Sequence, residues 1–119
     1  MTSFPQFPRQ GEVYLSKALR QSGDTKKRPV VVVSIDLRNQ YSSTVLVVPF
    51  SSDIASASSN PCRPLVRRGE GGLEADSVAM CDLSTTIAKG YLQPSPYGII
   101  SQYSLTQIQT AIKIAVGLF

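Results

Sequence analysis

The sequence has no histidine and no tryptophan, and it has only two cysteines. Without histidine, a Ser-His-Asp triad, a histidine metal site and RNA cleavage by paired histidines are all excluded. Cys62 and Cys81 offer neither a disulfide framework nor metal-ligand spacing, so we interpret both as reduced packing residues of a cytosolic protein. No apolar run approaches the roughly 20 residues of a membrane helix, and the first residues lack the apolar stretch of a signal peptide, so we expect no membrane partner.

The 119 residues are enough for one compact domain over residues 1–119, and 42% of them are hydrophobic, which allows one core. Two Phe-Pro pairs make residues 1–10 too proline-rich for a helix, and we expect an extended N-terminal arm there. The formal net charge of +4 is compatible with a nucleic-acid partner but does not require one.

Residues 26–34 join three cations to four consecutive valines through Pro29. Consecutive β-branched residues favour a strand, and a strand that is apolar on both faces is typically buried on both. Pro29 lacks an N–H group, so it belongs at the first position of that strand. We therefore expect Arg28 at the mouth of a rigid strand, where it either meets phosphate or, together with Lys26 and Lys27, only solubilises a turn.

Apolar patterns predict strands at residues 12–15, 29–35, 44–50, 63–67 and 77–81, with residues 84–87 as strand or turn. The runs at 29–35 and 44–50 are alike in length and apolarity, so we expect them to be neighbours at the centre of a sheet. Pro49 predicts a bulge or an edge near the end of the second run. Residues 16–27, 36–43 and 51–61 are mostly polar and are predicted to be loops or connections, and the glycines at 69, 71 and 72 predict a turn with positive φ.

Apolar side chains recur at helical spacing between residues 105 and 116, which predicts a C-terminal helix. Ser104 is the predicted cap of this helix, and Gly117 is predicted to end it. Short strands, long loops and one terminal helix favour a mainly β fold, a small antiparallel barrel or half-barrel with the helix closing one side.

Four motifs together resemble the MazF/PemK toxins of type II toxin–antitoxin systems. They are Gly11-Glu12-Val13-Tyr14, Lys27-Arg28-Pro29 before the valines, Val47-Val48-Pro49-Phe50-Ser51-Ser52, and Asp76-Ser77-Val78 leading to Cys81-Asp82. The resemblance runs from Gly11 to the C-terminal helix. It implies an SH3-like barrel and a homodimer. It also implies an mRNA interferase, a metal-independent and cofactor-free endoribonuclease that cleaves single-stranded mRNA and is neutralised by an antitoxin protein.

Carried over by residue, the resemblance implies catalytic roles for Arg28, for Ser51 as the hydroxyl that contacts the reacting phosphate, and for Asp82 as an acid–base carboxylate. We expect further RNA contacts from a set of basic and hydroxyl side chains, namely Lys26, Lys27, Ser52, Thr85 and Thr86. The sequence departs from the family pattern at Met80 and Thr85, where an arginine is expected, and at Ser22, near the position of a histidine in some members.

Cleavage by the 2′-OH of the RNA requires loss of the hydroxyl proton, stabilisation of the phosphorane and protonation of the leaving 5′ oxygen. Arg28 suits the second task, because it stays cationic and offers a planar fork to phosphate oxygens. Asp82 is a candidate base if its strand ends beside Arg28, and otherwise a salt bridge or turn cap. A second interpretation stays open, because of Met80 and Thr85: a non-catalytic member of the fold that only binds antitoxin, RNA or a protein target such as gyrase.

Overall fold

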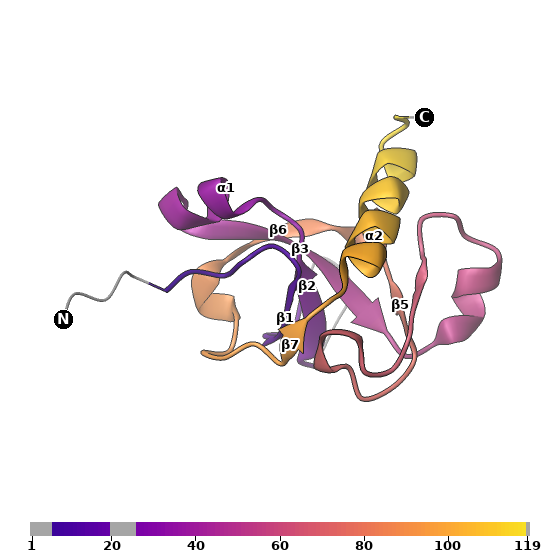
Figure 1. Cartoon of the computed structure of the whole chain (residues 1–119), viewed down its shortest axis with the longest axis horizontal. Coiled ribbons are helices and arrows are strands. Elements are labelled where there is room, and N and C mark those ends of the chain that lie inside the picture. Colours follow the sequence, from indigo (N-terminus) through magenta and orange to yellow (C-terminus); the bar gives the residue numbers. More distant parts are fainter. Residues whose placement is uncertain (1–5, 20–25, 119) are drawn as a thin grey trace.

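A computed structural model describes residues 6–19 and 26–118 of the chain (Figure 1). The strands are β1 (Glu12–Ser16), β2 (Arg28–Val32), β3 (Thr44–Ser51), β4 (Leu65–Val66), β5 (Ser77–Ala79), β6 (Thr85–Ala88) and β7 (Gly98–Ile99). The helices are α1 (Asp36–Tyr41), α2 (Gln102–Ala115) and the short 3-10 helices η2 (Ile54–Ser58), η3 (Glu70–Gly72), η4 (Cys81–Leu83) and η5 (Lys89–Tyr91). The predicted arm over residues 1–10 and the loop over residues 16–27 lie partly outside the described residues, and Ser22 lies wholly outside them.

The strands form an antiparallel sheet in the order β4-β5-β3-β2-β1-β7, and β6 pairs with β3 outside this path. Val30 of β2 lies opposite Pro49 of β3, and Val32 lies opposite Val47. The sheet bends into a half-barrel, and α2 packs across one side of it (Figure 1). The predicted fold and the central pairing of the two apolar strands are therefore confirmed.

Strand β3 changes partner along its length. Its first half pairs with β6, from Thr44 to Val47, and its end pairs with β5 through Phe50 and Ser51. Pro49, predicted to mark a bulge or an edge, lies between these two ladders. Its missing N–H therefore interrupts neither of them.

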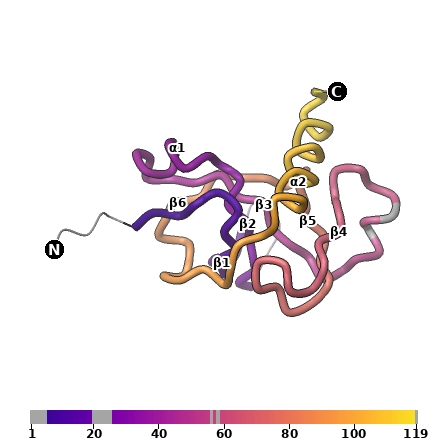
Figure 2. Tube along the Cα trace, in the orientation of Figure 1, coloured from indigo at the N-terminus to yellow at the C-terminus, as the bar shows by residue number. Residues whose placement is uncertain are grey.

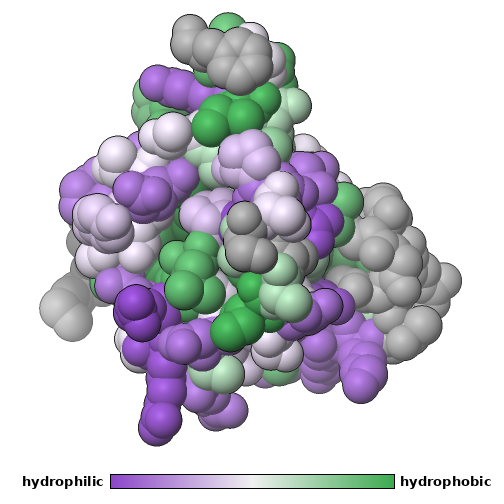
Figure 3. All heavy atoms as spheres, turned by 90° about the vertical axis from the view of Figure 1, so that its right-hand side faces the viewer, coloured by the Kyte–Doolittle hydropathy of each residue, from purple (hydrophilic) through white to green (hydrophobic). Residues whose placement is uncertain are grey.

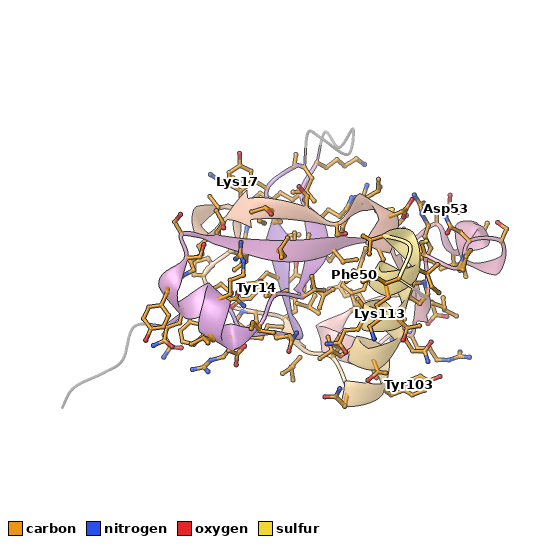
Figure 4. All side chains as sticks on the ribbon, turned by 90° about the horizontal axis from the view of Figure 1, so that it is seen from above. Tyr14, Lys17, Phe50, Asp53, Tyr103 and Lys113 are labelled. Atoms are coloured by element: carbon orange, nitrogen blue, oxygen red, sulfur yellow. The ribbon has the colours of Figure 1, made fainter. Side chains whose placement is uncertain are left out.

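Strand β2 is buried on both faces because a hydrophobic cluster lies on each side of it. Val31 belongs to the helix-side cluster, which includes Phe50 and three residues of α2, Leu105, Ile108 and Ala111. The neighbouring valines, Val30 and Val32, belong to the barrel-side cluster, which includes Tyr14. In Figure 4, Phe50 lies beside α2, whereas Tyr14 lies away from that helix. Each of the three valines is 0% exposed, and full burial of such a side chain contributes about 1.5–3 kcal/mol.

Helix α2 begins one turn earlier than the sequence predicts. Ser101 is its cap, and the Ser101 hydroxyl oxygen accepts the backbone N–H of Ser104 at 3.2 Å, so the prediction of Ser104 as the cap is wrong. Glu70 accepts the Ser101 N–H at 2.8 Å, and this bond lowers the pKa of the Glu70 carboxyl. A negative charge at this position also suits the positive end of the helix dipole. In the described part of the chain, no helix is long and apolar enough to span a bilayer.

Helix α1 occupies residues that the sequence predicts as a connection. Its Asn39 is 0% exposed, and its amide donates to the carbonyl oxygens of Ser34 and Pro8. The hydroxyl of Ser34 donates to the Asn39 side chain and accepts the N–H of Leu46. This buried polar network fastens the N-terminal segment to β3. An apolar pattern could not reveal α1, because a polar side chain is what anchors it.

Gly71 provides a test of the packing. Its φ is +57°, and a Cβ added there would overlap Cγ2 of Val13. We expect Gly71→Ala to lower the free energy of unfolding by about 2–3 kcal/mol, because backbone strain adds to the overlap. The control is Gly69→Ala, where φ is +96° but nothing lies within 4 Å of the added Cβ, so only strain of about 1 kcal/mol remains. Urea unfolding measures both, and equal losses would contradict the packing argument.

Candidate functional site: a cationic cleft

A cleft of about 490 Å³ opens where β2 begins and β3 ends. Its lining comes from four parts of the chain: residues 26–29, residues 50–52, residues 72–75 with Ser77, and Tyr97. Segments far apart in the sequence thus meet at one place. Figure 2 shows part of this arrangement, in which the trace near β7 passes beside the turn that precedes β5.

Arg28 is held in the cleft by its strand and by a hydrogen bond. Its guanidinium Nη1 donates to the carbonyl oxygen of Phe50 at 2.8 Å. The register of Val30 opposite Pro49, continued by two residues, puts Ser51 opposite Arg28 on the neighbouring strand. Both side chains line the cleft, so the structure brings the predicted arginine and hydroxyl together.

The hydroxyl of Ser51 can still donate a hydrogen bond to a ligand. Its Oγ accepts the backbone N–H of Asp53 at 3.1 Å, which fixes the oxygen at the end of β3. A serine oxygen that accepts one bond still carries an O–H that can donate another. This donor points to a role in binding an anionic oxygen next to Arg28.

The lining is mainly cationic. Lys26, Lys27 and Arg28 contribute three positive charges, and Glu74 contributes the one carboxylate among the lining residues that the structure describes. Lys26 and Lys27 are exposed, so their ammonium groups can follow a flexible chain of phosphates. The cleft therefore favours a negatively charged polymer as its ligand, with one phosphate bound beside Arg28.

Asp82 lies outside this cleft lining. It belongs to η4, and its two carboxylate oxygens accept hydrogen bonds from Nε and Nη2 of Arg63 at 3.0 and 3.1 Å. This pairing raises the pKa of Arg63. Strand β5 already ends at Ala79, and η4 turns the chain before Asp82. The structure therefore does not place Asp82 in the lining that holds Arg28, and it gives this carboxylate the salt bridge that the sequence offered as its alternative.

The predicted RNA-contacting residues divide into two groups. Lys26, Lys27 and Ser52 line the cleft. Thr85 and Thr86 lie on β6, opposite Val47 and Leu46 in the other half of β3, and they are not part of the cleft lining. The pairing of β6 with the first half of β3, which the sequence does not reveal, separates these threonines from Arg28.

Two residues whose side chains could stack on a base or act as a nucleophile, Tyr14 and Cys81, are core residues. Tyr14 is 6% exposed, and its hydroxyl donates a hydrogen bond to the Glu12 carboxylate at 3.0 Å. Burial, together with the charge and the hydrogen bond of Glu12, raises the pKa of Tyr14 to about 12. It is therefore a packing residue instead of a surface on which a base stacks. Cys81 is buried against α2, and burial is the main cause that raises the pKa of its thiol to about 12. A thiol that stays protonated is a poor nucleophile, in agreement with the predicted packing role.

Sequence reasoning missed Glu74, Ser77 and Tyr97. They reach the cleft because η3 packs against the strand that follows Tyr97, and this contact is not local in sequence. The glycines at 71, 72 and 98 were a usable signal, since such residues allow close backbone approach. In the ranges 6–19 and 26–118, no group of three or more cysteine, aspartate and glutamate side chains is placed to hold a metal ion.

Comparison with known proteins identifies several relatives. The family model of the PemK-like, MazF-like toxins of type II toxin–antitoxin systems matches residues 9–116. The endoribonuclease MazF of Staphylococcus saprophyticus is 30% identical over 112 residues, which cover 92% of each chain, and that of Staphylococcus epidermidis is 29% identical over the same coverage.

Solved structures share the fold. An endoribonuclease in complex with its cognate antitoxin, from a mycobacterial species, has a TM-score of 0.78 at 22% identity, covering 94% of this chain and 97% of that one. MazF from Deinococcus radiodurans has a TM-score of 0.77 at 16% identity, covering 95% and 99%.

The cationic lining predicts how binding depends on salt. We expect Lys26→Ala and Lys27→Ala each to weaken binding of a single-stranded DNA oligonucleotide, which lacks the 2′-OH and is not cut. Each variant should reduce the slope of log affinity against log salt concentration by about 0.7, because one phosphate contact is lost. Fluorescence anisotropy over a salt series measures this slope. Lys113→Ala, on α2 and outside the cleft lining, is the matched control and should leave the slope unchanged.

Proposed function

The chain belongs to the PemK-like, MazF-like toxins of type II toxin–antitoxin systems, and we propose that it is an endoribonuclease toxin that cleaves single-stranded mRNA in the Arg28 cleft. The observation that carries this proposal is that Arg28 and Ser51 lie together where β2 begins and β3 ends, inside a cationic cleft of about 490 Å³. The reaction needs no metal: the RNA supplies its own nucleophile, and the chain supplies the charge that stabilises the transition state.

In the proposed mechanism, the 2′ oxygen of the RNA loses its proton and bonds to the neighbouring phosphorus. The bond from phosphorus to the 5′ oxygen breaks, and that oxygen takes up a proton, which leaves a 2′,3′-cyclic phosphate and a 5′-hydroxyl end. Arg28 stabilises the negative charge that builds on the phosphorane, because its fork stays cationic and is already oriented by Phe50. Ser51 donates its O–H to a non-bridging oxygen, while Lys26 and Lys27 hold flanking phosphates.

The proposed partners are a cognate antitoxin and a second copy of the chain. Large apolar side chains remain exposed on the side that carries α2 and the β3–β5 connection, among them Ile54, Leu65, Val116 and Leu118. Figure 3 shows hydrophobic surface on this side, at the C-terminal part of α2 and in the middle of the face. Exposed apolar surface of this kind favours protein contacts. The mycobacterial endoribonuclease of the same fold was solved with its cognate antitoxin.

Arg28 provides the direct test. We expect wild type to cut a short single-stranded RNA in EDTA, and Arg28→Ala to lower kcat/KM by about 10³-fold or more, because the phosphorane loses its cationic donor. Arg28→Lys keeps the charge but not the fork, and we expect it to fall between the two. The measurement is cleavage of an end-labelled RNA followed on a denaturing gel.

The control for this test is Arg67→Ala, which removes an exposed arginine outside the cleft lining and should leave cleavage unchanged. If Arg28→Ala cuts as fast as wild type, the proposed site is wrong. If wild type binds the RNA but cuts none, the chain is a non-catalytic binder of the same fold.

Asp82→Asn separates the two roles that the sequence left open. Because the carboxylate is engaged by Arg63, we expect a loss of about 0.5–1 kcal/mol in the free energy of unfolding and less than a tenfold change in kcat/KM. An acid–base residue would instead cost about 10²–10⁴ in rate. Urea unfolding and RNA cleavage, measured on the same preparation, decide between these outcomes.

A further inference from the structure

The cationic cleft contains two side chains that the proposed chemistry does not use. Glu74 and Tyr97 line the same space as Arg28 and Ser51, but they come from the turn before β5 and from the residue before β7. Tyr97 is 50% exposed, and Glu74 is also exposed. Both side chains are thus accessible to a ligand that enters the cleft.

Close backbone packing fixes where these two residues stand. A Cβ added to Gly72 would lie 2.6 Å from the carbonyl oxygen of Tyr97, and one added to Gly98 would lie 2.9 Å from the carbonyl carbon of Gly71. The N–H of Tyr97 also donates to the carbonyl of Val13 at 2.7 Å, which ties it to β1. On the other segment, Leu73, which precedes Glu74, is only 5% exposed. The backbones of Glu74 and Tyr97 therefore share one rigid support.

The charge of Glu74 indicates which part of an RNA it meets. A carboxylate accepts hydrogen bonds and donates none, and it repels a phosphate. In a cleft whose cations hold the phosphates, the partner of Glu74 must be a group with N–H or O–H donors. On a nucleotide the strongest donors of this kind lie on the edges of the bases.

We propose that Glu74 and Tyr97 form a base-recognition subsite that selects guanine next to the cleavage site. This inference rests on the proposed function and adds its substrate preference. The ring of Tyr97 stacks on the base, as aromatic side chains do with unpaired bases in single strands. The carboxylate of Glu74 accepts two hydrogen bonds from the Watson–Crick edge of that base.

Guanine fits a carboxylate better than the other bases do. Its edge carries two adjacent donors, N1–H and the N2 amino group, which match the two oxygens of one carboxylate. Adenine and cytosine present one amino donor beside a ring nitrogen that is itself an acceptor. Uracil presents one N–H between two carbonyl oxygens. In each of these three cases a lone pair of the base faces a carboxylate oxygen.

The test uses guanine and inosine, because inosine keeps N1–H but lacks the N2 amino group. A pool of short single-stranded RNAs first identifies the sequences that wild type cuts, and each guanine in a cut RNA is then replaced by inosine. We expect one replacement to lower kcat/KM by roughly tenfold or more, because one of the two hydrogen bonds to the carboxylate is lost. Glu74→Gln should remove this difference between guanine and inosine, because its amide offers one acceptor and one donor.

Matched variants separate recognition from other effects. Tyr97→Ala removes the stacking ring and should raise KM, whereas Tyr97→Phe keeps the ring and should raise KM less. Glu12→Gln makes the same change at a carboxylate outside this cleft lining and should leave the guanine preference intact.

Three outcomes would overturn the proposed subsite. In the first, wild type cuts without any guanine preference, and in the second, Glu74→Gln keeps that preference. In the third, Glu74→Gln lowers kcat equally on every RNA and shifts the pH profile. The last result would make Glu74 an acid–base group. If wild type cuts no RNA, the proposed function fails by itself. Binding of DNA oligonucleotides that carry deoxyguanosine or deoxyinosine then still tests the subsite. Support would be a roughly tenfold weaker binding of the deoxyinosine oligonucleotide to wild type and equal binding of the two to Glu74→Gln. Equal binding of the two oligonucleotides to wild type would overturn the subsite.

Discussion

The burial of β2 on both faces is the constraint on which the cleft depends. Val31 packs toward α2, while Val30 and Val32 pack into the barrel side, so the strand cannot tilt toward either side without exposing apolar surface. Arg28 begins this strand, and its guanidinium is bonded to the Phe50 carbonyl. The buried valines of β2 thus fix the backbone of Arg28, and the Phe50 carbonyl fixes its guanidinium.

The sequence predicts the parts of the fold that follow from local pattern. The valine run, the strand ending in Ser51, the positive-φ glycines and the apolar face of α2 all carry such patterns, and the structure agrees with each. Helix α1 was missed because the buried side chain that anchors it is Asn39, whose partners come from other segments. Ser101 was missed as a cap because Ser104 is the same residue type one turn later.

The candidate site divides in the same way. Arg28 and Ser51 were predictable together because they end neighbouring strands whose pairing can be inferred. The sequence could not decide between the two roles of Asp82, because its orientation depends on η4 and on Arg63, which is 19 positions away in the sequence. Glu74 was missed because it reaches the cleft through the contact between Gly72 and Tyr97, at which the glycines were the one sequence signal. Residues on the two central strands were accessible to sequence reasoning, whereas those placed by loop packing or by the pairing of β6 were not.

The change of partner along β3 has a consequence for how this site can be silenced. The strand that carries the Phe50 carbonyl and Ser51 is bonded to β2 on one side and to β6 and then β5 on the other. Displacing either group would therefore disturb the pairing of β3 with its neighbours, which costs more free energy than moving an exposed loop. An inhibitor could therefore distort this arrangement only at a high cost in free energy. Inhibition of such a site favours occupancy over deformation: a blocking segment that fills the cleft or covers its entrance and leaves the scaffold unchanged.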